Sequence, residues 1–134
     1  MSIFERKFME RKIRVLVVDD EPDVVEILSY NLVKNNYVVD RAYSGMEALN
    51  AAINNIPDLI IMDIRMPEMS GIETCRQIRH IDKLKDIPVL FLTADSDEYT
   101  TMSAFDAGAS HFITKPIKPG IIAGMINELL QKKK

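Results

Sequence analysis

Five side chains suited to phosphoryl chemistry stand at the ends of short apolar runs. The carboxylates Asp19 and Asp20 close one run and the carboxylate Asp63 closes another. The hydroxyl of Thr93 and the ammonium of Lys115 follow two more. The runs themselves cover residues 13–18, 37–41, 58–62, 88–92 and 111–113. Clustered carboxylates bind a hard cation, and a lysine and a hydroxyl beside them indicate a ligand with phosphoryl oxygens.

The three aspartates would repel one another at close range, so each would raise the pKa of its neighbours. Mg²⁺ removes this repulsion, since it takes oxygen ligands from carboxylates, waters and phosphate groups. We therefore expect Asp19, Asp20 and Asp63 to hold Mg²⁺, with the backbone carbonyl of Arg65 completing the protein's ligands. The alternative, in which each aspartate caps a turn, suits one isolated aspartate better than three at neighbouring strand ends.

Asp63 is the candidate nucleophile, because a carboxylate at the tip of a buried strand can attack phosphorus and form an acyl phosphate. Lys115 supplies a point charge for a phosphoryl oxygen. A cis bond to Pro116, which costs little before proline, would hold that ammonium over the site. Thr93 is placed to donate to the same oxygens. The simpler alternatives are a solvated surface lysine and a threonine favoured by strand propensity.

Strand and helix patterns alternate along the chain and predict how these residues are brought together. Helical patterns begin after Glu21, at Ser44, at Ser70 and at Asp97, and a last one covers 121–130. Alternation of this kind predicts a parallel sheet with helices on both faces. We predict an α/β fold of (βα)5 type, a flavodoxin-like doubly wound sheet with strand order 2-1-3-4-5. This order places the ends of strands 1 and 3 at the switch point where such sheets bind ligands.

The bulk composition fits one soluble domain of 134 residues, with 47% hydrophobic and 28% charged residues. A net charge of −3 gives no reason to expect direct binding to nucleic acid or anionic membranes. The single cysteine, Cys75, excludes an intrachain disulfide and is expected to be buried. We expect a leader over residues 1–12, either a short amphipathic helix or disordered, a domain over 13–131 and a basic tail over 132–134. The absence of a signal peptide or an apolar spanning run predicts a cytoplasmic protein.

Together the motifs resemble the receiver domain of two-component response regulators, from residue 13 to about residue 130. The matching stretches are VLVVDDE (15–21), MDIRMPEMSG (62–71), LTA (92–94), FDAGA (105–109) and TKP (114–116). The resemblance implies that Asp63 accepts a phosphoryl group from a sensor histidine kinase or a histidine phosphotransfer protein. It implies that Asp20 ligates Mg²⁺ directly and that Asp19 acts mainly through water. It also implies a bacterial signalling protein that catalyses only its own phosphorylation and dephosphorylation.

The resemblance further implies a switch built from Thr93 and Phe112. Thr93 would move toward the phosphoryl group, and Phe112, at the family's switch-aromatic position, would fill the space left behind. The surface formed by helix 97–107, strand 111–113 and helix 121–130 would then change for a downstream effector protein or for a phosphorylation-dependent homodimer. The alternative for Phe112 is an ordinary buried strand residue.

Arg65 and Asp95 occupy positions that flank the phosphoryl group in this family. Their opposite charges are expected to pair across the mouth of the site and to slow dephosphorylation by restricting water. The alternative is two solvated loop charges, since exposed pairs are weak.

Two other protein classes also place functional groups after strand 1 or strand 3. Haloacid-dehalogenase-type phosphatases need a second aspartate two residues after the nucleophile, where this chain has Arg65. A flavodoxin-type flavin carrier needs a Ser/Thr/Gly-rich loop where this chain has residues 19–22, DDEP. Within the favoured class, we expect a stand-alone receiver. The alternative is the receiver segment of a longer regulator with a DNA-binding or enzymatic output domain.

Overall fold

A computed structural model describes residues 11–94 and 98–132 of the chain. Most of the predicted leader, Asp95 and the last two lysines therefore lie outside the described residues. The strands are β1 (Arg14–Val18), β2 (Val38–Ala42), β3 (Leu59–Asp63), β4 (Val89–Thr93) and β5 (His111–Thr114). The helices are α2 (Pro22–Lys34), α3 (Gly45–Asn54), α4 (Gly71–Arg79), α5 (Glu98–Asp106) and α6 (Pro119–Lys132).

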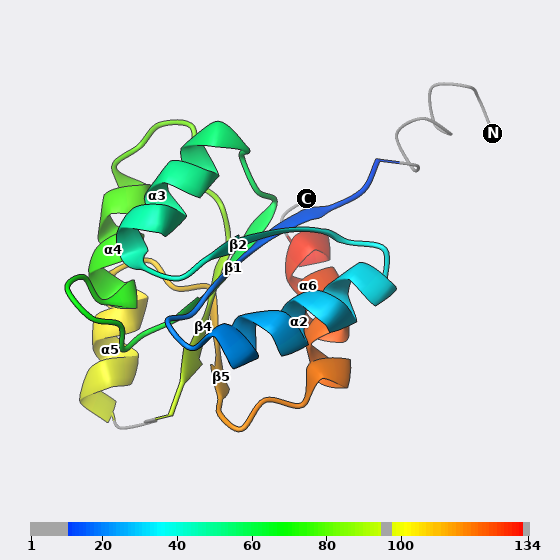
Figure 1. Ribbon diagram of the computed structural model, residues 1–134. Coiled ribbons are helices and arrows are strands. Elements are labelled where there is room, and N and C mark those ends of the chain that lie inside the picture. Colours follow the sequence, from blue (N-terminus) through cyan, green and yellow to red (C-terminus); the bar gives the residue numbers. More distant parts are fainter. Residues whose placement is uncertain (1–10, 95–97, 133–134) are drawn as a thin grey trace.

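The five strands form one parallel sheet in the order β2-β1-β3-β4-β5. Helices α3, α4 and α5 cover one face, while α2 and α6 cover the other (Figure 1). The doubly wound fold and the strand order predicted from the sequence are both confirmed. The more polar strand, β2, lies at an edge of the sheet, where one side of it has no neighbouring strand.

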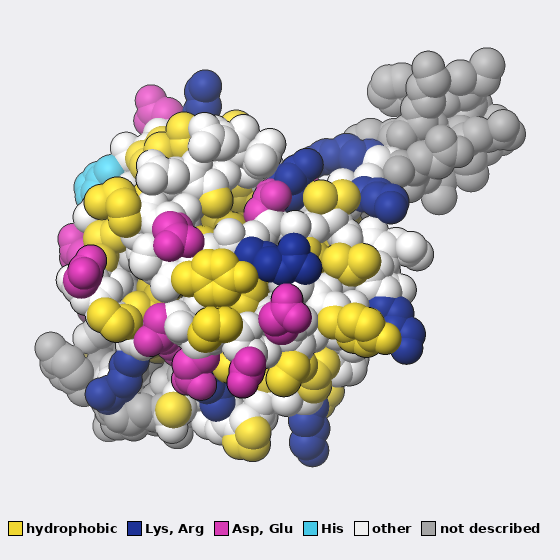
Figure 2. Space-filling model, viewed as in Figure 1, with side chains coloured by type: hydrophobic (Ala, Val, Ile, Leu, Met, Phe, Trp, Pro, Cys, Tyr) yellow, Lys and Arg dark blue, Asp and Glu magenta, His cyan; other side chains and the backbone are white. Residues whose placement is uncertain are grey.

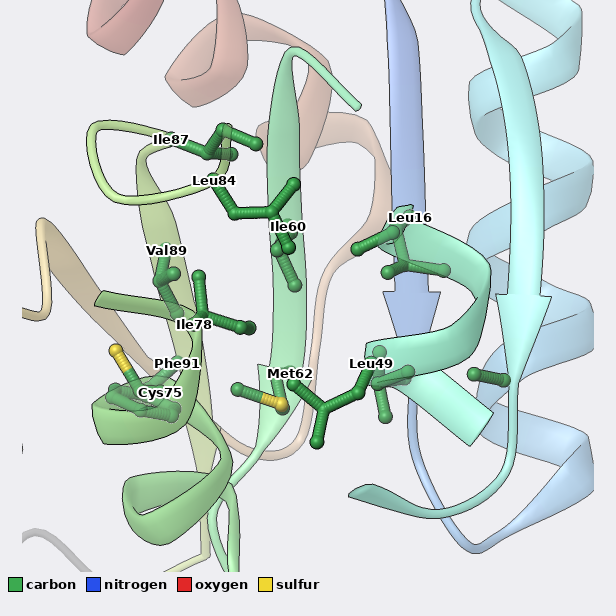
Figure 3. Close-up of a cluster of buried hydrophobic side chains, with 14 of the residues drawn as sticks. Leu16, Leu49, Ile60, Met62, Cys75, Ile78, Leu84, Ile87, Val89 and Phe91 are labelled. Carbon is green, nitrogen blue, oxygen red and sulfur yellow. The ribbon is translucent and has the colours of Figure 1, made fainter. Parts of the chain in front are cut away.

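Alternate residues of the central strands supply two hydrophobic layers, as the pleat of a strand requires. Leu16, Ile60 and Phe91 point to the layer under α3, α4 and α5 (Figure 3). Val17, Ile61 and Leu90 point to the layer under α2 and α6. Every residue of β3 and β4 is buried, which explains why those stretches are continuously apolar until their last residue.

Serine side chains fix where two of the helices begin. The Ser44 hydroxyl accepts a hydrogen bond from the Glu47 amide, and the Ser70 hydroxyl accepts one from the Glu73 amide, each at 3.1 Å. Both caps follow from the sequence pattern. After the C-terminal end of α5, Gly108 adopts a φ of 99°, a conformation that favours glycine and that ends the helix.

The helices bury narrower stripes than the sequence predicts. Six residues from the apolar patterns of α2, α3 and α5 are more than half exposed: Ile27, Val33, Met46, Ile53, Met102 and Phe105. A helix on an open sheet buries only part of its circumference, so apolar residues beside the buried stripe face solvent. Among the α5 side chains that the structure describes, the small Ala104 is the buried one, and Ala107 is buried directly after the helix.

Cys75 is buried in α4, as predicted. Its thiol lies 3.2 Å from the carbonyl oxygen of Ala107 and donates to it. Burial raises the pKa of this thiol, with a smaller opposing effect from Arg79. The side chain therefore packs α4 against the end of α5 as a neutral group.

Candidate functional site

Parallel pairing brings Asp19 and Asp63 to the same level of the sheet. Val18 is paired with Met62 in the register of β1 and β3, and the two aspartates are the next residues along each strand. The Asp19 amide donates to the carbonyl of Ala42, which fixes the backbone as it leaves the sheet. The predicted meeting of these two carboxylates at the switch point follows from the fold.

The three predicted carboxylates form one cluster. Carboxylate oxygens of Asp19, Asp20 and Asp63 lie within 4.8 Å of one another. Asp19 is fully buried, Asp63 is 5% exposed and Asp20 is exposed. In the view of Figure 2, acidic side chains gather beside the loop that joins β1 to α2 in Figure 1.

The donor set of this cluster fits a hard divalent cation. Asp19 Oδ2 is buried and has no hydrogen-bond donor aligned with it. Its other oxygen, Oδ1, accepts from the Glu21 amide at 2.9 Å, so the turn fixes the direction of the carboxylate. A buried and oriented carboxylate oxygen, beside two further carboxylates, is what an oxygen-seeking ion requires.

Lys115 reaches into the cluster from the end of β5. Its Nζ lies 3.1 Å from Asp19 Oδ2, 3.5 Å from Asp63 Oδ1 and 3.7 Å from Glu21 Oε1. The Lys115 amide donates to the Thr93 carbonyl at 2.8 Å, and the Lys115–Pro116 peptide bond is cis. The lysine is therefore held over two buried carboxylates, where it acts as their shared counter-charge.

Burial dominates the electrostatics of the two inner carboxylates. It raises the pKa of Asp63 to about 6, with the negative charge of Asp19 adding to the effect and Lys115 opposing it. Burial also raises the pKa of Asp19, against the hydrogen bond from Glu21 and the attraction of Lys115. For Lys115, burial lowers the pKa, but the carboxylates outweigh it and the net shift is upward. The lysine is thus charged at neutral pH, and Asp63 is mainly ionised there.

Thr93 lies on β4, which pairs with β3, and Phe112 lies on β5, which pairs with β4. Thr93 is the last residue of β4, is 4% exposed, and pairs in register with Thr114. Phe112 is paired in register with Phe91 and packs partly buried against the core under α5. Both residues are therefore on the strands where the sequence analysis expected them, at the end of β4 and within β5.

Arg65 lies in the loop after β3 and borders an open groove of about 700 Å³. The groove begins at Asp20, passes the start of α4 at Ser70, and reaches Arg76 and Ser103. It gives access to the carboxylate cluster from the side of α4 and α5. Since Asp95 is outside the described residues, the predicted Arg65–Asp95 pairing stays a prediction.

Two further residues belong to the site and were not singled out by the sequence analysis. Glu21 contributes its amide to Asp19 and its carboxylate to the surroundings of Lys115. Gly71 passes so close to the Asp63 carbonyl that a Cβ atom there would overlap it, while its amide donates to the Ile64 carbonyl at 2.7 Å. Adjacency to Asp19 and Asp20 was the available signal for Glu21. No local pattern marks the clearance needed at Gly71.

A five-stranded doubly wound sheet with an acidic cluster and a lysine at its carboxyl edge is the arrangement that the sequence analysis predicted for a receiver domain. The response regulator receiver domain family matches residues 15–127. The chain belongs to this family of two-component signalling proteins. None of the helices in the described part of the chain combines the length and apolar character needed to cross a membrane.

Named relatives and solved structures agree with this assignment. The alkaline phosphatase synthesis transcriptional regulatory protein PhoP of Bacillus subtilis is 39% identical over 89% of this chain and 49% of its own length. Response regulator MprA of Mycobacterium sp. (strain KMS) is 38% identical over 90% of this chain and 51% of its own. The chain thus spans about half the length of these curated relatives. The chemotaxis protein CheY4 of Vibrio cholerae superposes with a TM-score of 0.86 at 29% identity, over 89% of this chain and 99% of CheY4.

Proposed function

We propose that this chain is a phosphorylation-controlled signalling switch in which Asp63 accepts a phosphoryl group. The observation that carries the proposal is the position of Asp63, 5% exposed beside Asp19 and 3.5 Å from Lys115 Nζ. Two carboxylates buried beside one ammonium cost folding free energy, and such costs cluster at functional sites. A purely structural role would not need this arrangement.

Asp19, Asp20 and Asp63 would hold Mg²⁺ through carboxylate oxygens, and Arg65 through its backbone carbonyl. When bound, the ion neutralises phosphoryl oxygens so that an anionic nucleophile can approach. The cluster fits this role through the buried Asp19 Oδ2 and through the hydrogen bond that orients Asp19. In this proposal Asp20, the exposed member, ligates directly and Asp19 acts mainly through water.

The chain's own residues perform the transfer. A carboxylate oxygen of Asp63 attacks phosphorus and forms a new O–P bond. The P–N bond to the donor histidine breaks, and its electron pair stays on the imidazole nitrogen. Lys115, already 3.5 Å from Asp63, binds a phosphoryl oxygen of the product as a point charge.

Thr93 and Phe112 then report the new charge to the surface. A phosphoryl group adds about −1.5 to −2 charge at the site. Thr93 moves to donate to it, and Phe112 moves into the space that Thr93 leaves. The surface of α5, β5 and α6 changes as a result, for a downstream effector protein or for a homodimer of the phosphorylated form.

The biological setting is proposed on the same basis. The phosphoryl donor is a sensor histidine kinase or a histidine phosphotransfer protein in the cytoplasm of a bacterium. The receiver, residues 13–131, binds neither nucleic acid nor membrane directly and catalyses only its own phosphorylation and dephosphorylation. The sequence analysis favoured a stand-alone receiver, and its alternative is the receiver segment of a longer regulator. Relatives about twice as long as this chain favour the longer regulator. The match to CheY4, which covers 99% of that protein's chain, favours the stand-alone form.

Incubation with acetyl phosphate and Mg²⁺, followed by intact-mass and peptide mass spectrometry, tests the proposal. We expect one phosphoryl adduct on the peptide that contains Asp63, and none in Asp63→Asn. Asp86→Asn, an exposed aspartate distant in sequence from the cluster, is the matched control and should still react. Absence of an adduct on the wild-type chain, while a known receiver reacts in the same tube, would overturn the proposal.

We also propose that Arg65 and Asp95 set the lifetime of the phosphoryl group. Their charges would restrict water at the mouth of the groove that Arg65 borders. The double variant Arg65→Ala/Asp95→Ala should lose its phosphoryl group about two- to fivefold faster, the scale of one exposed ion pair. Decay of the labelled adduct after removal of the donor measures this. An unchanged decay rate would refute the role of the pair.

A further inference from the structure

Three phenylalanines form a series from the core of the sheet to its surface. Phe91 in β4 is fully buried, Phe112 in β5 is partly buried, and Phe105 in α5 is 51% exposed. The ring centroids of Phe91 and Phe112 are 6.1 Å apart with the rings tilted. Phe105 and Phe112 are closer, at 4.9 Å, with the edge of one ring against the face of the other at 75°. Phe112 therefore contacts an aromatic ring on its inner side and another on its outer side.

Phe105 is poorly explained as a core residue. Helix α5 carries the buried Ala104 and is followed by the buried Ala107, while Phe105 and Met102 leave about half of their surface in solvent. The ring of Phe105 nevertheless takes the edge-to-face arrangement that gives aromatic pairs their added attraction. The specific partner of this exposed ring is Phe112, the residue to which we assign the switch.

We propose that Phe105 is a positioning residue that holds Phe112 in its present place and so favours the unphosphorylated form. The inference rests on the proposed function, in which Phe112 moves toward the space left by Thr93. Strand register puts Thr93 next along the same face of the sheet, since Phe91 pairs with Phe112 and Thr93 with Thr114. In this inference the Phe112 ring leaves Phe105 as it moves along that face, so the contact stabilises only the starting state.

Removing the contact shifts the equilibrium toward the form that binds a phosphoryl group. An edge-to-face pair is worth a factor of about two to ten in an equilibrium constant. Phe105→Ala should therefore bind beryllofluoride, in the presence of Mg²⁺, about two- to tenfold more tightly than the wild type. Phosphorylation by acetyl phosphate should accelerate by a similar factor.

Four variants separate this role from a general loosening of α5. Phe105→Tyr keeps the ring and should behave like the wild type, whereas Phe105→Leu keeps an apolar side chain without a ring and should resemble Phe105→Ala. Met102→Ala truncates a similarly exposed side chain of the same helix and should leave beryllofluoride affinity unchanged. In a Phe112→Ala background, Phe105→Ala should have no further effect, because the partner ring is gone.

Titration of each full-length variant with beryllofluoride and Mg²⁺, followed by NMR, gives the affinities. Tighter binding in Phe105→Ala and Phe105→Leu alone supports the inference. The inference would be overturned by equal affinities in all variants or by weaker binding in Phe105→Ala. It would also be overturned by an equal gain in Met102→Ala, or by an effect of Phe105→Ala that persists without Phe112. If the wild type itself forms no beryllofluoride adduct at Asp63, the proposed function fails first, and that result is distinguishable from failure of Phe105 alone.

Discussion

At the scale of single residues, the site is governed by the cost of burying charge. Asp19 and Asp63 share one nearby ammonium, that of Lys115, which leaves the buried group with excess negative charge. Burial raises the pKa of both carboxyls because it disfavours their charged forms, and the negative charge of Asp19 adds to the shift at Asp63. In the folded chain without a cation, the buried charges of these carboxylates therefore lower the free energy of unfolding. A proton, a metal ion or a neutral side chain at this place removes that cost.

Asp63→Asn should stabilise the cation-free protein at neutral pH. The pKa of Asp63 is raised from 3.8 to about 6 on folding. The folded state binds a proton at the Asp63 carboxyl more tightly than the unfolded state does. Protonation of Asp63 therefore makes its full contribution to stability below pH 3.8, and that contribution is lost as the pH rises through about 6. The gain from the neutral amide is on the order of 1–3 kcal/mol at pH 7.5 and disappears near pH 4. Denaturant unfolding with EDTA at both pH values measures it, and an equal gain at both would contradict the assignment.

Mg²⁺ should raise the melting temperature of the wild-type chain at pH 7.5. Binding to the folded state alone adds about 2.7 kcal/mol when the ion is at about one hundred times its dissociation constant. Asp20→Asn should weaken this response, because it removes the exposed ligand of the cluster, whereas Asp86→Asn should respond like the wild type. Thermal denaturation across a Mg²⁺ titration gives the comparison. A melting temperature that ignores Mg²⁺ would count against the metal site.

At the scale of elements, backbone clearance around Asp63 is as important as the charges. The start of α4 approaches the end of β3 at Gly71, whose amide donates to the Ile64 carbonyl. A Cβ atom at this position would overlap the carbonyl of Asp63. The β3–α4 loop can therefore close over the strand only if this helix begins with glycine.

Gly71→Ala should destabilise the protein by about 1–3 kcal/mol, since it overpacks a backbone contact. It should also slow phosphorylation, because the carbonyl that it displaces belongs to Asp63. Gly124→Ala is the matched control, since a Cβ atom in that part of α6 meets nothing within 4 Å. The control should gain about 0.5–1 kcal/mol from reduced chain entropy. Urea unfolding of both variants provides the measurement, and similar behaviour of the two would refute the clearance argument.

The sequence allowed the strands and the central carboxylates to be predicted because one physical rule covers both. Strands buried on both faces are continuously apolar, so Asp19 and Asp63 stand out as the first polar residues after them. Parallel pairing then brings them level. Lys115 was predictable from its place after the last strand.

Other features depend on distances between elements that no local pattern encodes. The exposure of Ile27 and Val33 depends on how wide a stripe α2 buries against the sheet. The clearance at Gly71 depends on how closely α4 approaches β3. The contact between Phe105 and Phe112 depends on the placement of α5 over β5. Each of these needs the packed structure before it can be stated.

At the scale of the whole molecule, the proposed function assigns the carboxyl edge of the sheet to receiving the signal and the surface of α5 to passing it on. The carboxylate cluster lies at the carboxyl edge, and the aromatic series leads from β4 through β5 to α5. The outer residue of that route, Phe105, is exposed. A change in charge at the edge thus has a short packed route to an exposed face.

Beryllofluoride with Mg²⁺ should change hydrogen exchange in α5 and β5 more than in α3. In the proposed switch Thr93 and Phe112 move, whereas α3 packs over β1 and β2 away from that route. Hydrogen exchange read by mass spectrometry, with and without the probe, gives the comparison. Equal protection of residues 98–114 in both states would contradict the proposed route.

The position of Cys75 has a practical consequence for such experiments. The thiol is the only one in the chain, is buried, and donates to the Ala107 carbonyl. Reagents that attack exposed thiolates will therefore leave it untouched in the native fold. A spin label or fluorophore attached to a cysteine introduced on the surface of α5 will report from that position alone, without replacement of Cys75.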